Sequence, residues 1–262
     1  MRYRLTTIIT LLTLMAAGAA FLTPSALAAL TIEANHKDIR MNLTYHGSSV
    51  SVSGMSDPNV DLILKITAAS GNAEEKMMRK DREAGFLWMN VEQLTVKNVP
   101  ALYFIRSTKP VADLLDPAQL KANGIGYAAV EDSLEITPTP GPEQREKLLA
   151  DFIKYKESGA VYSQSVGDVE IKPDPAGDTY ETVFNWPYQA PPGDYAVTVY
   201  AVKEDKIVDK AESPVTVEET GIVKTLDNMA QNNAALYGTA AIGISLTAGF
   251  GVGMIFKGGG SH

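Results

Sequence analysis

The chain has 262 residues, no cysteine and a formal net charge of −8 at pH 7, from 23 basic and 31 acidic side chains. The lack of cysteine excludes disulfides, thiolate catalysis and cysteine-ligated iron–sulfur or haem groups. The acidic balance is unfavourable for nucleic acid or anionic lipid surfaces, which both bind basic patches. We therefore expect no nucleic-acid partner and no cofactor.

Residues 1–28 have the three regions of a secretory signal peptide. A basic start precedes an apolar core over residues 5–21, and Pro24 is followed by the small residues Ala26 and Ala28. This order is typical of a signal that is cleaved after its second small residue. We predict cleavage after Ala28, with an uncleaved N-terminal anchor as the alternative.

Residues 29–112 are predicted to form a first β-sandwich lobe. Apolar and polar residues alternate over 39–45 and 50–52 on either side of a polar turn, which is typical of a hairpin. Residues 59–67 are predicted to form a more continuous apolar strand. Another strand is predicted over residues 99–105, with Pro100 near its start. Short strands at this spacing indicate a sandwich.

Residues 113–160 are predicted to form a helical connecting segment. A helix over 143–155 is favoured because Pro142 occupies a tolerated first-turn position and Gly159 follows the end. Its apolar stripe consists of Leu148, Leu149, Phe152, Ile153 and Tyr155. We expect this stripe to pack on the adjoining sheet, with docking of a partner as the alternative.

Residues 161–218 are predicted to form a second sandwich lobe, with strands over 169–171, 182–184 and 195–202. Tyr195 follows a Pro-Pro-Gly-Asp sequence, as in a late strand of immunoglobulin-like sandwiches, where a tyrosine hydroxyl bonds back to upstream backbone. The fold prediction is therefore mainly β, with two immunoglobulin-like lobes, a helical insert and one C-terminal transmembrane helix.

Residues 219–233 are predicted to form a polar helical stalk, and residues 234–256 a transmembrane helix. No charged side chain occurs from residue 236 to 256, and a helix of that length spans about 30 Å, enough to cross a bilayer. Residues 257–262 would form a short cytoplasmic tail. The signal peptide would place the body in the periplasm, and Lys257 at the inner end agrees with this orientation.

A series of short motifs runs along nearly the whole chain after residue 28. In order they are Arg79-Lys80, Gly85-Phe86-Leu87-Trp88-Met89-Asn90, Val99-Pro100-Ala101-Leu102-Tyr103, Ser107-Thr108, Gly124-Ile125-Gly126, Pro192-Gly193-Asp194-Tyr195 and Leu236-Tyr237-Gly238. Their order resembles the family of proteobacterial "putative transmembrane proteins" first noted in alphaproteobacteria. The resemblance implies a signal peptide, an exported β-rich body and one C-terminal helix, and it supplies no catalytic residues. It also implies a loose link to sulfite-exporter-like permeases. The Gly-rich span departs from the bulkier, Trp-containing helix expected of the family.

Small residues recur every four positions in the predicted span, at Ala241, Ser245, Gly249 and Gly253. Such a stripe lets another membrane helix approach closely. We predict that this face packs against a second copy of the chain or against a multi-pass permease.

Two histidines, His36 and His46, are the alternative functional residues, because across a hairpin they can meet with Met41 and Met55 as soft ligands. Ordinary exposed histidines are the simpler interpretation.

Several carboxylates are candidate Ca²⁺ ligands, although a solvated loop is the stronger interpretation. They are Glu131, Asp132, Glu135, Asp174 and Asp178. The aromatic residues Trp88, Trp186 and Tyr188 either line a ligand cleft or belong to the core of the sandwich.

The sequence favours a protein of the inner membrane that crosses it once and carries a periplasmic body. We expect a non-enzymatic accessory or assembly partner of a membrane transport system. The alternatives are a periplasmic metal-handling or enzymatic module that uses His36 and His46, and a self-associating envelope structural protein.

Overall fold

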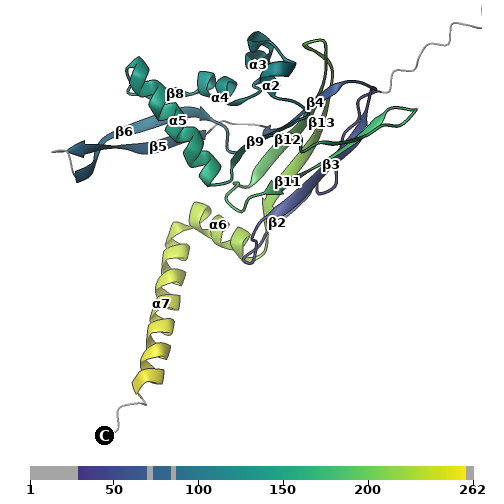
Figure 1. Cartoon of the computed structure of the whole chain (residues 1–262). Coiled ribbons are helices and arrows are strands. Elements are labelled where there is room, and N and C mark those ends of the chain that lie inside the picture. Colours follow the sequence, from purple (N-terminus) through teal and green to yellow (C-terminus); the bar gives the residue numbers. More distant parts are fainter. Residues whose placement is uncertain (1–28, 70–72, 84–86, 258–262) are drawn as a thin grey trace, which may run out of the picture.

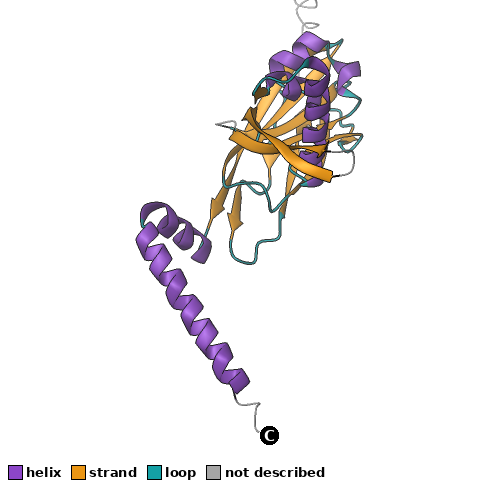
Figure 2. Ribbon diagram, turned by 90° about the vertical axis from the view of Figure 1, so that its left-hand side faces the viewer, coloured by secondary structure: helices purple, strands orange, loops and turns teal. Residues whose placement is uncertain are grey.

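The computed structural model describes residues 29–69, 73–83 and 87–257 (Figure 1). The predicted signal peptide, including Ala26 and Ala28, lies outside the described residues. Within the described part, strands form a layered body, and two helices at the C-terminal end project from it as an arm (Figures 1 and 2).

Two sheets form a sandwich. The four-stranded sheet has the order β1 (Glu33–Ala34), β3 (Ser48–Ser56), β11 (Asp178–Trp186) and β10 (Glu170–Lys172). The six-stranded sheet has the order β2 (Asp38–Met41), β13 (Lys206–Glu219), β12 (Gly193–Lys203), β4 (Asp61–Ala68), β7 (Tyr103–Ser107) and β9 (Tyr162–Val166). Their inner faces share one hydrophobic core.

Strand β11 shows why the sandwich closes. Its buried residues alternate with less buried ones, so that Tyr180, Phe184 and Trp186 face the core. Phe184 stacks on Phe104 of the other sheet with ring centroids 6.1 Å apart. Trp186 meets Tyr195 edge to face at 4.9 Å, a geometry that aromatic pairs prefer. These pairs join the two sheets.

The prediction of a mainly β fold with a C-terminal apolar helix is confirmed. The residues assigned to two separate lobes, however, share both sheets. Strand β3 pairs antiparallel with β11 along the full length of β11, and β4 pairs antiparallel with β12. The physical reason is that each half of the chain leaves strand edges whose backbone groups need partners, and the other half supplies them.

A third sheet lies beside the sandwich and consists of β5 (Ala73–Glu83), β6 (Leu87–Val99) and β8 (Glu135–Thr137). The charged residues 79–83 lie in β5.

Helix α5 (Pro142–Ser158) covers this third sheet, as Figure 1 shows. Leu149 and Phe152 of α5 line a small apolar space with Met77 and Leu94 of the sheet. The expected packing of the α5 stripe is therefore confirmed, except at Tyr155, which is 63% exposed. Three short helices occupy the connection before it: α2 (Val111–Leu114), α3 (Pro117–Asn123) and α4 (Tyr127–Ser133).

The projecting arm consists of α6 (Ile222–Asn232) and α7 (Ala234–Lys257). Between them Asn233 leaves the helical conformation, with φ −146° and ψ 61°, and the arm is bent there (Figures 1 and 2). Of the described residues, Ala234–Met254 form the one helix that is long and apolar enough to cross a membrane. A candidate membrane-spanning helix is therefore present, with nearly the bounds that the sequence predicted.

Candidate functional site

Helix α7 stands free of the rest of the chain, and none of its span is buried within the structure. Large apolar side chains are consequently exposed, among them Ile244 at 69% and Phe250 at 71%. Apolar surface costs about 25 cal/mol per Å² in water, so a helix of this composition is stable only against lipid or protein. The free helix is therefore a candidate membrane-spanning segment.

The serine and threonine hydroxyl groups in α7 are satisfied by the helix itself. Ser245 Oγ donates to the carbonyl of Ala241 at 2.8 Å, and Thr247 Oγ1 donates to that of Gly243 at 2.7 Å. A polar group in hydrocarbon needs an internal partner, and this back-bonding supplies one. The span can therefore enter lipid without an uncompensated hydroxyl at these positions.

The predicted small-residue face consists of Ala241, Ser245, Gly249 and Gly253, and the structure places all four on α7. A Cβ built on Gly249 or Gly253 would meet no atom within 4 Å. Nothing in the described chain covers this face, which leaves room for a neighbouring helix backbone. Packing of another helix there stays a prediction.

The two histidines lie in separate exposed loops, His36 before β2 and His46 after it. His36 Nδ1 lies 3.0 Å from the side-chain oxygen of its neighbour Asn35, and His46 Nδ1 lies 2.5 Å from the carbonyl of Thr44. Both rings thus have a local hydrogen-bond partner. In the part of the chain that the structure describes, no group of three or more histidine and carboxylate side chains is placed to hold a metal ion.

The other sequence candidates are placed as follows. Trp186 is 2% exposed and belongs to the core, whereas Tyr188 is 61% exposed, so these two residues do not line a common cleft. The side chain of Trp88 is outside the described part. Asp132 forms an ion pair with Lys121 at 2.9 Å. Asp174 accepts a hydrogen bond from the backbone of Ala176, as in an Asx turn.

A cavity of about 480 Å³, which sequence reasoning missed, lies between β5, α5 and the loop before β12. Its charged residues are Lys156 of α5 and Glu75 of β5, which form an ion pair. The Lys156 side chain is only 8% exposed, and its ammonium lies 5.5 Å from the Phe152 ring centroid and 5.8 Å from that of Tyr162. Burial, and secondarily the Glu75 carboxylate, raises the pKa of the Tyr162 hydroxyl. The pair carries no net charge.

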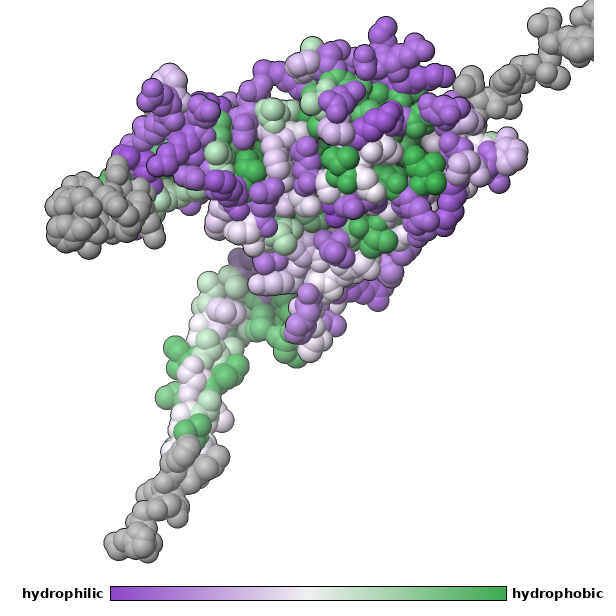
Figure 3. All heavy atoms as spheres, in the orientation of Figure 1, coloured by the Kyte–Doolittle hydropathy of each residue, from purple (hydrophilic) through white to green (hydrophobic). Residues whose placement is uncertain are grey.

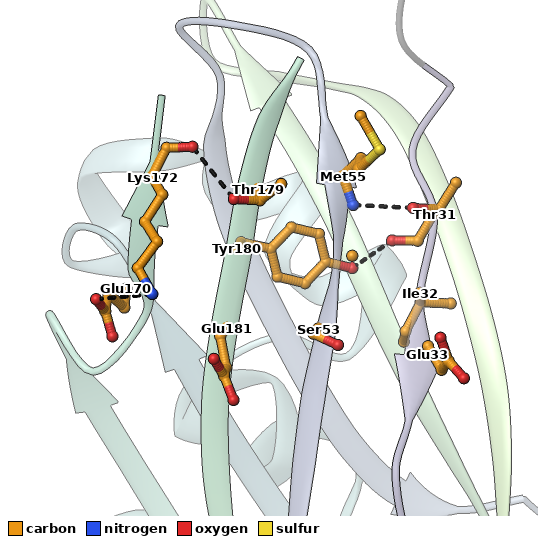
Figure 4. A pocket seen from close by; sticks show the side chains of 11 residues that line it. Thr31, Ile32, Glu33, Ser53, Met55, Glu170, Lys172, Thr179, Tyr180 and Glu181 are labelled. Carbon is orange, nitrogen blue, oxygen red and sulfur yellow. Dashed lines mark hydrogen bonds and ion pairs between the residues drawn. The ribbon is translucent and has the colours of Figure 1, made fainter. Parts of the chain in front are cut away.

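Figure 4 shows a second cavity, of about 430 Å³, on the four-stranded sheet. Tyr180 crosses its floor, and the hydroxyl donates to the carbonyl of Thr31 at 2.5 Å. This contact depends on Gly54, because a Cβ at that position would lie 2.0 Å from the same carbonyl oxygen. The backbone N–H of Met55 donates to Thr31 Oγ1 at 2.8 Å. These hydrogen bonds hold the segment around Thr31 against strands β3 and β11 of the four-stranded sheet.

Comparison with known proteins supports the membrane assignment. The model of a family described as "Putative transmembrane protein (Alph_Pro_TM)" matches residues 29–258. No curated protein matches the chain. Among solved structures, the chain is similar to domain 1 of VCBP3 from Branchiostoma floridae at 10% identity, over 74% of this chain and 96% of that one, with a TM-score of 0.25. A score this low supports no inference here, and the fold assignment rests on the strand pairing.

Proposed function

The chain belongs to this family of "putative transmembrane proteins", and from that premise we propose that it is a non-enzymatic accessory or assembly partner of a membrane transport system. In this proposal α7 anchors the protein in the inner membrane, the β body lies in the periplasm, and the C-terminus is cytoplasmic. The partner is a multi-pass permease that packs against α7.

One observation carries the proposal: α7 is uncovered along its whole span, including the face formed by Ala241, Ser245, Gly249 and Gly253. An anchor needs only apolar bulk, whereas glycine lowers helix propensity by about 1 kcal/mol relative to alanine. Small residues on one face permit close backbone contact between helices in lipid, which offsets that cost. A partner helix therefore explains the composition better than anchoring alone.

The orientation is supported by the sequence at both ends. Residues 1–28 have the pattern of a secretory signal, and export of the segment that follows would leave the body outside the cytoplasm. Lys257 at the far end of α7 agrees with the tendency of basic residues to stay on the cytoplasmic side.

The proposal is tested by gentle detergent extraction of a tagged full-length chain from native membranes, followed by mass spectrometry of the proteins that co-purify in stoichiometric amount. Gly249→Ile adds a bulky side chain to the small-residue face, and Gly251→Ile is the matched control. The control changes the same residue type two positions away, about 160° around the helix from Gly249.

We expect a multi-pass membrane protein in the eluate of the parent and of Gly251→Ile, and its loss from Gly249→Ile. Recovery of the chain alone in all three preparations would contradict the proposal. Recovery of a second copy without a permease would instead favour a self-associating envelope protein.

A further inference from the structure

Helix α6 is amphipathic, although its sequence suggested a polar stalk. Ile222, Leu226 and Met229 are spaced to lie on one face of the helix, where Ile222 is 63% and Leu226 is 42% exposed. Lys224 and Asn228 lie on the opposite face. None of the helix's residues is buried against the body. The apolar face is thus formed but has no partner within the described chain.

The position of α6 limits what can cover this face. Only Thr220 and Gly221 separate the helix from the end of β13, and Gly221 has φ 63°, a backbone conformation that favours glycine. After α6, Asn233 alone precedes the span. The apolar face therefore lies between the sandwich and the candidate span, and Figure 3 shows hydrophobic surface continuing from α7 to the base of the body.

The adjoining end of the sandwich carries a further exposed apolar residue. Strand β2 runs parallel to β13, and its last pair joins Met41 with Glu219. The backbone of Thr220 also donates to the carbonyl of Met41 at 2.8 Å. The loop after β2 therefore begins beside α6, and its Leu43 is 74% exposed.

From these observations we propose that α6 lies in the plane of the membrane surface, with Ile222, Leu226 and Met229 in the outer boundary between headgroups and acyl chains. An interfacial amphipathic helix buries its apolar face about 5–10 Å into that boundary. Tyr237, one turn into α7, is the type of residue that is enriched at the same level. The role of α6 is to fix the orientation of the β body above the bilayer.

The lipid surface is favoured over a protein partner because α6 is continuous with the span that already enters the bilayer. The α6 helix carries one basic and one acidic residue, Lys224 and Asp227, so it has no net charge. Its attachment must then come from apolar burial and not from attraction to anionic headgroups. The interaction is accordingly insensitive to salt.

The chain has no cysteine, so a single introduced cysteine can be labelled without background. The test uses the full chain in lipid nanodiscs, with an environment-sensitive fluorophore at Leu226→Cys and, as the control on the polar face, at Asn228→Cys. Ile222→Cys is a second reporter of the apolar face. Lipids brominated near the top of the acyl chain serve as quenchers.

We expect labels at positions 226 and 222 to emit at shorter wavelength than the label at 228, and to lose emission in brominated lipid at low and at high salt. The label at 228 should do neither. Equal water exposure at 226 and 228 would overturn the proposal. A blue-shifted label at 226 that brominated lipid does not quench would also overturn it, because a protein would then cover the face.

Discussion

The Tyr195 hydroxyl provides a quantitative test of how the sandwich is held together. The hydroxyl donates to the carbonyl of Pro191 at 2.6 Å, and the ring packs against Trp186. Tyr195 is 2% exposed, and burial raises the pKa of its hydroxyl to about 12. The replacement Tyr195→Phe removes this hydrogen bond and keeps the ring contact.

The expected loss of unfolding free energy depends on whether the Pro191 carbonyl finds another hydrogen-bond donor in the variant. A net hydrogen bond contributes about 0.5–1.5 kcal/mol, and leaving a buried partner unsatisfied costs about 1–3 kcal/mol. Pro191 is exposed, so water can reach its carbonyl in the variant. We therefore expect a loss of about 1 kcal/mol. The replacement Tyr195→Ala, which also removes the ring, should cost about 3–5 kcal/mol.

The assay is urea unfolding of the full chain in mild detergent, followed by circular dichroism. With a slope of about 2 kcal/mol per molar urea, the Tyr195→Phe midpoint should fall by about 0.5 M. Tyr188→Phe is the matched control, since Tyr188 is 61% exposed, and its midpoint should not move. An unchanged midpoint for Tyr195→Phe, or a loss as large as that of Tyr195→Ala, would show that the hydroxyl does not contribute as a single net hydrogen bond.

Three further predictions follow from the body. Gly54→Ala should lower the free energy of unfolding by about 1–3 kcal/mol, because its Cβ would lie 2.0 Å from the Thr31 carbonyl oxygen; an unchanged urea midpoint would contradict this. Burial raises the pKa of the Tyr200 hydroxyl from 10.0 to about 12, so the stability that the neutral hydroxyl contributes is complete below pH 10 and is lost as the pH rises toward 12. Replacing Tyr200 by Phe should therefore reduce the fall in urea midpoint between pH 10 and about 12. An identical fall in both proteins would contradict this prediction. Alanine at both His36 and His46 should change the unfolding free energy by less than about 0.5 kcal/mol and leave copper binding, measured by calorimetry, unaltered; loss of measurable binding would favour the metal-handling alternative.

Local sequence patterns predicted the features that depend on neighbouring residues. The Pro-Pro-Gly-Asp lead-in predicted the Tyr195 hydrogen bond, which the structure confirms. Periodicity also predicted α5 and the side that packs on a sheet, although Tyr155 is 63% exposed. The candidate membrane span in α7 was predictable because hydropathy and length suffice to define such a segment.

Features that depend on distant residues were not predictable from the sequence. Periodicity identifies β3 and β11 as strands, but their pairing joins residues more than a hundred positions apart, and no local signal specifies that partner. The ion pair of Lys156 with Glu75 depends on the same long-range arrangement. The amphipathic face of α6, in contrast, was detectable from the spacing of Ile222 and Leu226.

Photo-crosslinking of α7 in native membranes tests most directly whether its small-residue face packs against a permease. A photoreactive residue replaces Ser245 on the small-residue face or, as the control, Thr247 on the opposite side of the helix. We expect a product that joins the chain to a multi-pass membrane protein from position 245 and none from position 247. Crosslinks to lipid alone from both positions would contradict this expectation.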